Sequence, residues 1–197
     1  MGPLTVYLVR HAPTAGNLER RYIGVTDEPL CPEGQKRVAE TCLDIPPADV
    51  VYTSGMVRTV QTASVLFPQA EQVAVPDLHE MDFGTFEGRT ADEMADDAAY
   101  REWVDGWCLG RCPQGEDRAG FVARVCKGFD ALAEDAQRRG LSQVAAVVHG
   151  GTIMALLSSY AEPAKDYYDW HASWCHGYVC ACERVGGAWR MVVEREL

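Results

Sequence analysis

The stretch LTVYLVRHAPT, residues 4–14, is an apolar run that ends on Arg10 and His11 and then breaks into a turn. A second run, QVAAVVHGGT at residues 143–152, ends in the same way on His149, which two glycines follow. Short apolar runs bounded by turn residues predict buried strands, and a side chain at the end of such a strand lies at the edge of the sheet. If the two strands meet in the fold, both histidines lie at one edge and can form an anion site with the arginine.

The segments around these two runs alternate between strand-like and helix-like patterns. This alternation predicts an α/β fold in which helices cover a sheet. The segment 77–117 is different, because it is rich in Glu, Asp, Gly and Trp and has no clear strand pattern. We predict that it is an insertion over one end of the sheet, covering the site, within a single domain of residues 1–197. The predicted strands are 4–9, 50–53, 72–75, 143–148 and a terminal hairpin of 178–183 with 188–193; the predicted helices are 32–43, 55–67, 118–138 and 151–160.

The chain is strongly acidic, with a formal net charge of -11 and a pI near 4.8. Non-specific binding to nucleic acid needs a basic surface, so we expect no nucleic-acid partner, and the same charge disfavours anionic membranes. A local cluster of Arg and His can still hold a small anion. No segment reaches the roughly 20 apolar residues of a membrane helix, and the N-terminus lacks the pattern of a signal peptide. We therefore expect a cytoplasmic protein.

Eight cysteines are spread over the chain. A cytoplasmic chain of this length has a sufficient core without disulfides, so we expect most of the thiols to be small buried apolar residues. Structural zinc is a weaker alternative, for which Cys108 and Cys112 come nearest to the usual ligand spacing. We expect no metal site.

The residues at the end of the first strand suit an attack on phosphate. Positive charge beside His11 disfavours its protonated form, and the neutral imidazole is the form that acts as a nucleophile. Arg10 can bind an anion through two hydrogen bonds. Arg58 lies in the first turn of the predicted helix 55–67, with Ser54 as its N-cap, where the helix dipole disfavours a cation. A phosphate bound at that helix end would resolve the conflict; a salt bridge to a carboxylate is the alternative.

Further candidates lie beside the two histidines and at the start of the insertion. Thr14 and Asn17 can donate hydrogen bonds from the turn after the first histidine, although both are ordinary turn residues. Gly150 lets a ligand approach the backbone next to His149 closely. The apolar neighbours of Glu80 favour a protonated carboxyl, which a general acid needs. Other acidic residues that could take that role are Asp82, Glu87 and Glu116.

Together these motifs resemble the histidine phosphatase superfamily, the phosphoglycerate mutase-like proteins, over essentially the whole chain. Arg10 and His11, followed by Thr14 and Asn17, resemble the N-terminal RHG-x-T-x-x-N motif, with Ala12 in place of the usual glycine. The segment SGMVRTVQT (54–62) is similar to the second arginine motif, EMDFGTFEG (80–88) to the proton-donor segment, and HG (149–150) to the second histidine.

The resemblance implies a three-layer α/β/α sandwich with a mostly parallel central sheet. It implies that His11 is the nucleophile and becomes phosphohistidine. Arg10, Arg58 and His149 then hold the phosphoryl oxygens. Glu80 protonates the leaving oxygen and afterwards activates the water that releases phosphate. Neither a metal nor a cofactor is needed.

The small bacterial phosphatase branch, which includes α-ribazole phosphatase, is most similar through RYIGVTDEPL (21–30) and PQGE (113–116). Arg21 and Tyr22 are then candidates for the rim of the substrate site, with a solvated turn as the alternative. We expect a metal-independent phosphomonoesterase, a monomer or homodimer, that acts on a small phosphate ester such as α-ribazole 5′-phosphate. The alternatives are a cofactor-dependent phosphoglycerate mutase, disfavoured by the short chain, and a binding module without turnover.

Overall fold

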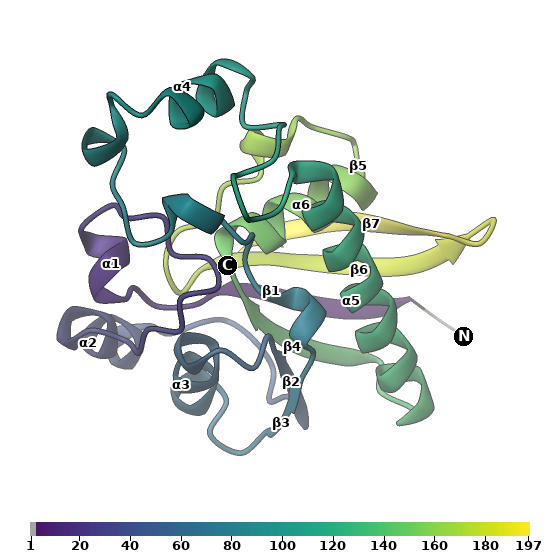
Figure 1. Cartoon of the computed structure of the whole chain (residues 1–197). Coiled ribbons are helices and arrows are strands. Elements are labelled where there is room, and N and C mark those ends of the chain that lie inside the picture. Colours follow the sequence, from purple (N-terminus) through teal and green to yellow (C-terminus); the bar gives the residue numbers. More distant parts are fainter. Residues whose placement is uncertain (1–2) are drawn as a thin grey trace.

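The computed structural model describes residues 3–197; Met1 and Gly2, part of the stretch used for the signal-peptide expectation, lie outside them. Its strands form one seven-stranded sheet (Figure 1). They are β1 (Leu4–Arg10), β2 (Val50–Thr53), β3 (Glu71–Ala74), β4 (Gln143–Val148), β5 (Ala161–Glu162), β6 (Gly177–Val185) and β7 (Ala188–Glu196). The strand order is β3-β2-β4-β1-β6-β7-β5. Four of the six neighbour pairs are parallel, as predicted, and the two that β6 makes, with β1 and β7, are antiparallel.

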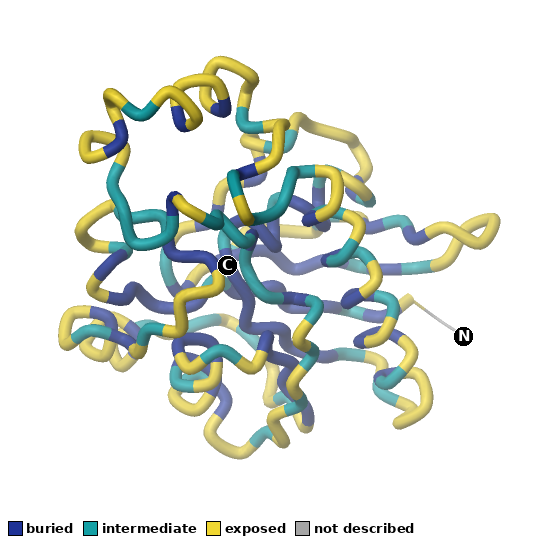
Figure 2. Tube along the Cα trace, in the orientation of Figure 1, coloured by how far each residue is buried: buried dark blue, intermediate teal, exposed yellow. Residues whose placement is uncertain are grey.

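Helices cover both faces of the sheet, which gives the expected three layers. The helices are α1 (Ala15–Leu18), α2 (Pro32–Glu40), α3 (Val57–Leu66), α4 (Ala98–Asp105), α5 (Arg118–Arg138) and α6 (Gly150–Tyr160). Successive residues of a strand point to opposite faces. In β1, Val6 and Leu8 join the apolar cluster under α5 and α6, while Tyr7 and Val9 join the cluster under α3. Figure 2 shows the inner strands as the most deeply buried part of the chain.

Most predicted boundaries agree with the structure to within two or three residues, and α5 and β4 agree at both ends. The terminal hairpin forms as expected, since Gly186 and Gly187 both take positive φ at its turn. The prediction of Ser54 as the N-cap of α3 is wrong. The helix begins at Val57, whose backbone N–H donates to the Asp27 carboxylate over 2.8 Å, so a distant residue replaces the local cap.

The segment 77–117 contains no strand and folds into the 3-10 turns η1 (Pro76–Leu78), η2 (Gly84–Phe86) and η3 (Asp92–Met94), followed by α4. Its buried side chains, among them Leu78, Phe86 and Trp103, join the cluster under α5 and α6. Figure 1 shows α4 on the same side of the molecule as α1, away from the tip of the β6–β7 hairpin. The segment is therefore packed onto the domain core at the end of the sheet where β1 and β4 finish.

Four of the eight thiols are buried, three are half-buried and Cys42 is exposed. Cys31 caps α2, because its sulfur accepts the Gly34 N–H. Within residues 3–197 no three His, Cys, Asp or Glu side chains gather as a metal site would require. None of the helices described is both long and apolar enough to cross a membrane.

Candidate active site

The parallel pairing of β1 with β4 brings the two motif histidines together. The backbone N–H of His11 donates to the carbonyl of Val148 over 2.9 Å, and the two imidazole rings lie 5.0 Å apart between centroids. Both rings are buried, with 4% of His11 and none of His149 exposed. The site therefore lies at the carboxyl ends of two adjacent parallel strands, which is where ligands bind in open α/β sheets.

His11 is held as a neutral base with one ring nitrogen available. Its Nδ1 lies 2.7 Å from the carbonyl oxygen of Ala12. A carbonyl can only accept, so Nδ1 carries the proton and the Nε2 lone pair is free to react. Burial, followed by the positive charges of Arg58 and Arg10, lowers the pKa of His11 well below its usual 6.5. Burial therefore lowers the pKa of His11 more than the charge of the adjacent Arg10 does.

A hydrogen-bond chain holds His149 through Arg58. The guanidinium Nε–H donates to His149 Nδ1 over 3.2 Å, so the imidazole proton is on Nε2, which lies 2.8 Å from Ser54 Oγ. The other two guanidinium nitrogens donate to the carbonyls of Thr26 and Gly24 over 2.8 and 2.7 Å. Burial also lowers the pKa of His149 well below its usual value. Arg58 itself has no exposed surface, and burial lowers its pKa too.

The expected sharing of one anion between Arg58 and the first turn of α3 is therefore not what the structure shows. The Asp27 carboxylate already accepts the first N–H of the helix. Arg58 turns away from the helix end toward the histidines, because two backbone carbonyls and an imidazole lie there to accept its hydrogen bonds.

Arg10 lies against Trp174 and has unused hydrogen-bonding capacity. The guanidinium carbon is 3.4 Å from the centroid of the indole, and one terminal nitrogen donates to the Ala172 carbonyl over 2.8 Å. Its buried Nε has no partner within residues 3–197. A Cβ at Gly150 would lie 3.3 Å from the guanidinium, so a glycine lets the end of β4 approach Arg10 closely. Burial lowers the pKa of Arg10 to about 10, while the nearby Glu80 carboxylate opposes that shift.

Glu80 reaches the start of α6, directly after the second histidine. Its two carboxylate oxygens accept the backbone N–H groups of Gly151 and Met81 over 2.8 and 2.9 Å. The other acidic candidates are engaged elsewhere: Glu116 pairs with Arg124 at 2.7 Å. Glu80 is thus the acidic candidate that contacts the helix of His149.

Glu87 supports the loop that holds Arg58. Its carboxylate accepts the backbone N–H groups of Gly24, Val25 and Thr26, each within 3.3 Å. It also accepts the Thr26 hydroxyl at 2.7 Å. Because these bonds orient the loop, the carbonyls of Gly24 and Thr26 point at the buried guanidinium. The sequence singled out Glu87 only as a rival acid.

The predicted substrate-binding residues take three different positions. Thr14 and Asn17 form a reciprocal capping box at the start of α1, beside the nucleophile candidate. Tyr22 packs edge-on against Phe83, 5.1 Å between ring centroids, at a cavity next to Glu80. The structure does not bring Arg21 into that cavity: its guanidinium bonds the carboxylates of Glu19 and Glu93 and the Gly88 carbonyl.

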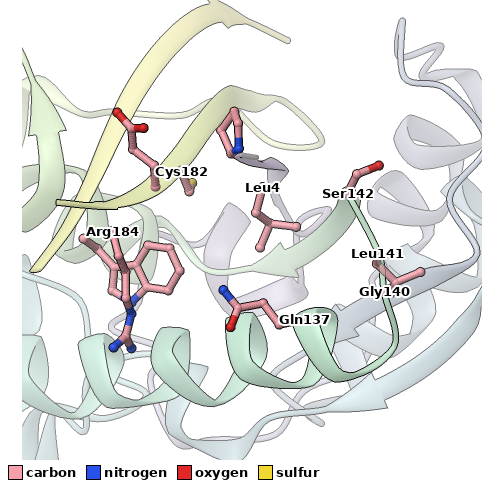
Figure 3. A pocket seen from close by; sticks show the side chains of 10 residues that line it. Leu4, Gln137, Gly140, Leu141, Ser142, Cys182 and Arg184 are labelled. Carbon is pink, nitrogen blue, oxygen red and sulfur yellow. The ribbon is translucent and has the colours of Figure 1, made fainter. Parts of the chain in front are cut away.

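Two cavities lie at opposite ends of the sheet. The cavity beside Glu80 has a volume of about 350 Å³. A second, of about 450 Å³, is lined by Leu4, Ser142, Gln137 and Arg184, as Figure 3 shows. Leu4 begins β1, Ser142 precedes β4, Gln137 lies in the last turn of α5, and Arg184 lies near the end of β6. This cavity is therefore at the opposite end of β1 and β4 from the histidines.

Three residues near the site were not singled out as functional by sequence: Ser54 and Trp174, which contact His149 and Arg10, and Asp27, which caps α3. The position of Ser54 just before the predicted helix 55–67 indicated a helix cap, not a contact with His149. Trp174 lies in the loop before β6, where no pattern marks it. Their roles depend on contacts across the sheet.

Comparison with known proteins gives one consistent relationship. The model of the histidine phosphatase superfamily (branch 1) matches residues 6–195. The chain is 32% identical over 163 residues to a protein of Klebsiella pneumoniae (strain 342) named probable phosphoglycerate mutase GpmB, covering 79% of this chain and 74% of the relative. The α-ribazole phosphatase of Shigella flexneri has the same fold, with a TM-score of 0.78 over 96% and 95% of the two chains and 23% identity. A phosphoglycerate mutase of Thermus thermophilus gives a TM-score of 0.70 over 98% of both chains, with 26% identity.

Proposed function

Because the chain belongs to the histidine phosphatase superfamily, we propose that it is a metal-independent phosphomonoesterase that works through a phosphohistidine on His11. One observation carries the proposal. Two largely buried guanidinium groups, of Arg10 and Arg58, have no carboxylate partner within residues 3–197 and flank a neutral histidine whose Nε2 is free. A buried guanidinium that forms no direct ion pair is costly, so such a cluster is suited to bind an anion.

The proposed reaction has two steps. His11 Nε2 attacks phosphorus, the ester P–O bond breaks, and the leaving oxygen takes a proton from the carboxylic acid of Glu80. Glu80, now a carboxylate, removes a proton from water, which attacks the phosphohistidine, and the P–N bond breaks to release phosphate. Arg10, Arg58 and His149 stabilise the charge on the phosphoryl oxygens in both steps.

A phosphoglycerate mutase is the second candidate, and the names of two relatives favour it. The cavity beside Glu80 argues for hydrolysis, because about 350 Å³ lies in the range of pockets that enclose drug-sized ligands and is larger than a three-carbon acid needs. As the first natural ester to test we propose α-ribazole 5′-phosphate, since the fold likeness to the Shigella flexneri phosphatase supports that choice.

The test is phosphate release from p-nitrophenyl phosphate, α-ribazole 5′-phosphate and 3-phosphoglycerate in the presence of EDTA. We expect release by the wild type, none by His11→Ala, and normal release by the control His171→Ala, which removes an exposed histidine. An acid-labile, base-stable phosphoryl group on the wild-type protein after quenching would support the intermediate. Isomerisation of 3-phosphoglycerate with a bisphosphate primer, without release, would favour the mutase. No turnover of any ester by folded protein would refute both enzymes.

A further inference from the structure

The cavity beside Glu80 has aromatic walls. On one side Tyr22, Phe83 and Trp103 pack edge-on against one another, with ring centroids 5.1 to 6.4 Å apart. On the other side Tyr167 and Tyr168 of η4 (Tyr167–Asp169) meet edge-on at 5.2 Å. Such walls offer flat apolar surface and ring edges, which favour another ring over a flexible chain.

Arg118 is the one cation that lines this cavity within the described part of the chain. Its guanidinium carbon lies 4.3 and 4.7 Å from the ring centroids of Tyr167 and Tyr168, and it donates to the Trp107 carbonyl and the Tyr168 hydroxyl. Within residues 3–197 it forms no ion pair with a carboxylate. Nearby arginines of the same region do so at 2.7 to 3.0 Å, namely Arg89 with Asp97, Arg111 with Asp117, and Arg124 with Glu116.

Tyr167 connects the two charged ends of the cavity. Its hydroxyl donates to the Gly151 carbonyl over 3.4 Å, beside Glu80, while its ring face lies under Arg118. Burial, with the Glu80 carboxylate as the next cause, raises the pKa of the Tyr167 phenol, so its hydroxyl stays protonated. Tyr167 therefore contacts both the backbone beside Glu80 and the guanidinium of Arg118, and both charged side chains line the same aromatic cavity.

We infer that this cavity is the leaving-group subsite for an aromatic alcohol that carries an acidic group, with the ester oxygen at Glu80 and the acidic group at Arg118. The inference rests on the proposed phosphatase function and narrows it. Arg118 uses one terminal nitrogen for the Trp107 carbonyl and the Tyr168 hydroxyl, while its other two nitrogens form no hydrogen bond within residues 3–197. These donors and the positive charge, which has no carboxylate partner there, suit an acidic group of a ligand. An ester whose ring is neutral, as in α-ribazole 5′-phosphate, is then a poorer substrate than one with a charged ring.

The test compares 4-carboxyphenyl phosphate with 4-carbamoylphenyl phosphate, which has nearly the same shape but no charge. The carbamoyl compound releases the more acidic phenol, so leaving-group chemistry by itself favours the amide. We expect kcat/KM of the wild type to favour the carboxylate by roughly fivefold to tenfold, the effect of one charge-assisted hydrogen-bonded pair at a half-exposed position.

Two variants and a control assign that preference to one residue. Arg118→Gln should bring the carboxylate-to-amide ratio to one or below, and Arg118→Lys should keep part of it. The control is Arg101→Gln, which removes an exposed arginine of α4 that does not line the cavity. The control should hydrolyse p-nitrophenyl phosphate at a rate near that of the wild type and keep the carboxylate-to-amide ratio, and for the two Arg118 variants the ratio is compared within each protein.

Binding of the product 4-hydroxybenzoate, measured by calorimetry against 4-hydroxybenzamide, tests the subsite without turnover. Tighter binding of the acid to wild type than to Arg118→Gln supports the inference even if no ester is hydrolysed, in which case the phosphatase proposal fails separately. Hydrolysis of both esters with no preference for the acid, or a preference that survives Arg118→Gln, overturns the inference and leaves the phosphatase proposal standing.

Discussion

A single methyl group at Gly151 should separate catalysis from stability in this protein. Gly151 lies in the first turn of α6, and its N–H donates to one Glu80 oxygen over 2.8 Å. A Cβ built on it would lie 2.1 Å from the other oxygen and 2.9 Å from the carboxyl carbon. Gly151→Ala therefore removes the space that the Glu80 carboxylate occupies, without touching the nucleophile or either arginine.

The size of the effect follows from that distance. To reach the 3.4 Å of an ordinary contact, the Glu80 oxygen has to retreat by about 1.3 Å from its present position. A displacement of about 1 Å in a catalytic group lowers the rate roughly 100-fold. The loss of one hydrogen bond, about 1 kcal/mol, is offset by the gain in helix propensity from Gly to Ala, also about 1 kcal/mol, so the free energy of unfolding should change little.

The assay is kcat/KM, which reports the steps up to the phosphohistidine, for an alkyl phosphate, whose alkoxide must be protonated, against p-nitrophenyl phosphate, whose phenolate leaves without help. We expect a loss of roughly 100-fold for the alkyl ester and less than about tenfold for the nitrophenyl ester, the same pattern as Glu80→Gln. Ser158→Ala, whose hydroxyl bonds only within α6, is the matched control. Unchanged turnover of the alkyl ester by Gly151→Ala would refute Glu80 as the positioned acid, and equal losses on both esters would show damage to the phosphate pocket instead.

Three further outcomes are expected. Both buried site histidines have a lowered pKa in the fold, so as pH falls below about 6.5 the unfolded chain binds protons first, and the free energy of unfolding decreases by up to about 1.4 kcal/mol per pH unit for each histidine. His11→Asn should reduce this dependence on pH in urea titrations, and an unchanged dependence would contradict the direction of the pKa shift. Glu87→Gln leaves loop N–H groups without an acceptor and should lower the free energy of unfolding in urea by about 1–3 kcal/mol. It should also raise KM, because the loop carbonyls that hold Arg58 lose their support, and a stable variant with unchanged KM would exclude Glu87 as the support of that loop. Trp174→Leu removes the aromatic face under Arg10 and should raise KM roughly threefold to thirtyfold, whereas Trp174→Phe should retain part of the affinity. An equal KM in the two variants would show that the stacking of Arg10 on the ring does not contribute to substrate binding.

The sequence predicted most of the fold because its signals are local. Short apolar runs predicted β1 and β4, apolar residues at a spacing of about 3.6 predicted α5, and two consecutive glycines predicted the hairpin turn. The same locality explains the error at α3. A serine in the right place predicts a cap from sequence, but Asp27 caps this helix from 30 positions away, and Ser54 instead contacts His149.

The amino-acid sequence by itself determined which reactive groups exist and that His11 and His149 each end a strand, because strand ends and turns are properties of short segments. Only the tertiary structure decided how those groups are held. The tautomer of His149 depends on Arg58 and Ser54, and the pKa of His11 depends first on how deeply the ring is buried. Burial and hydrogen bonds between distant segments arise when the sheet is assembled, so no local pattern specifies them.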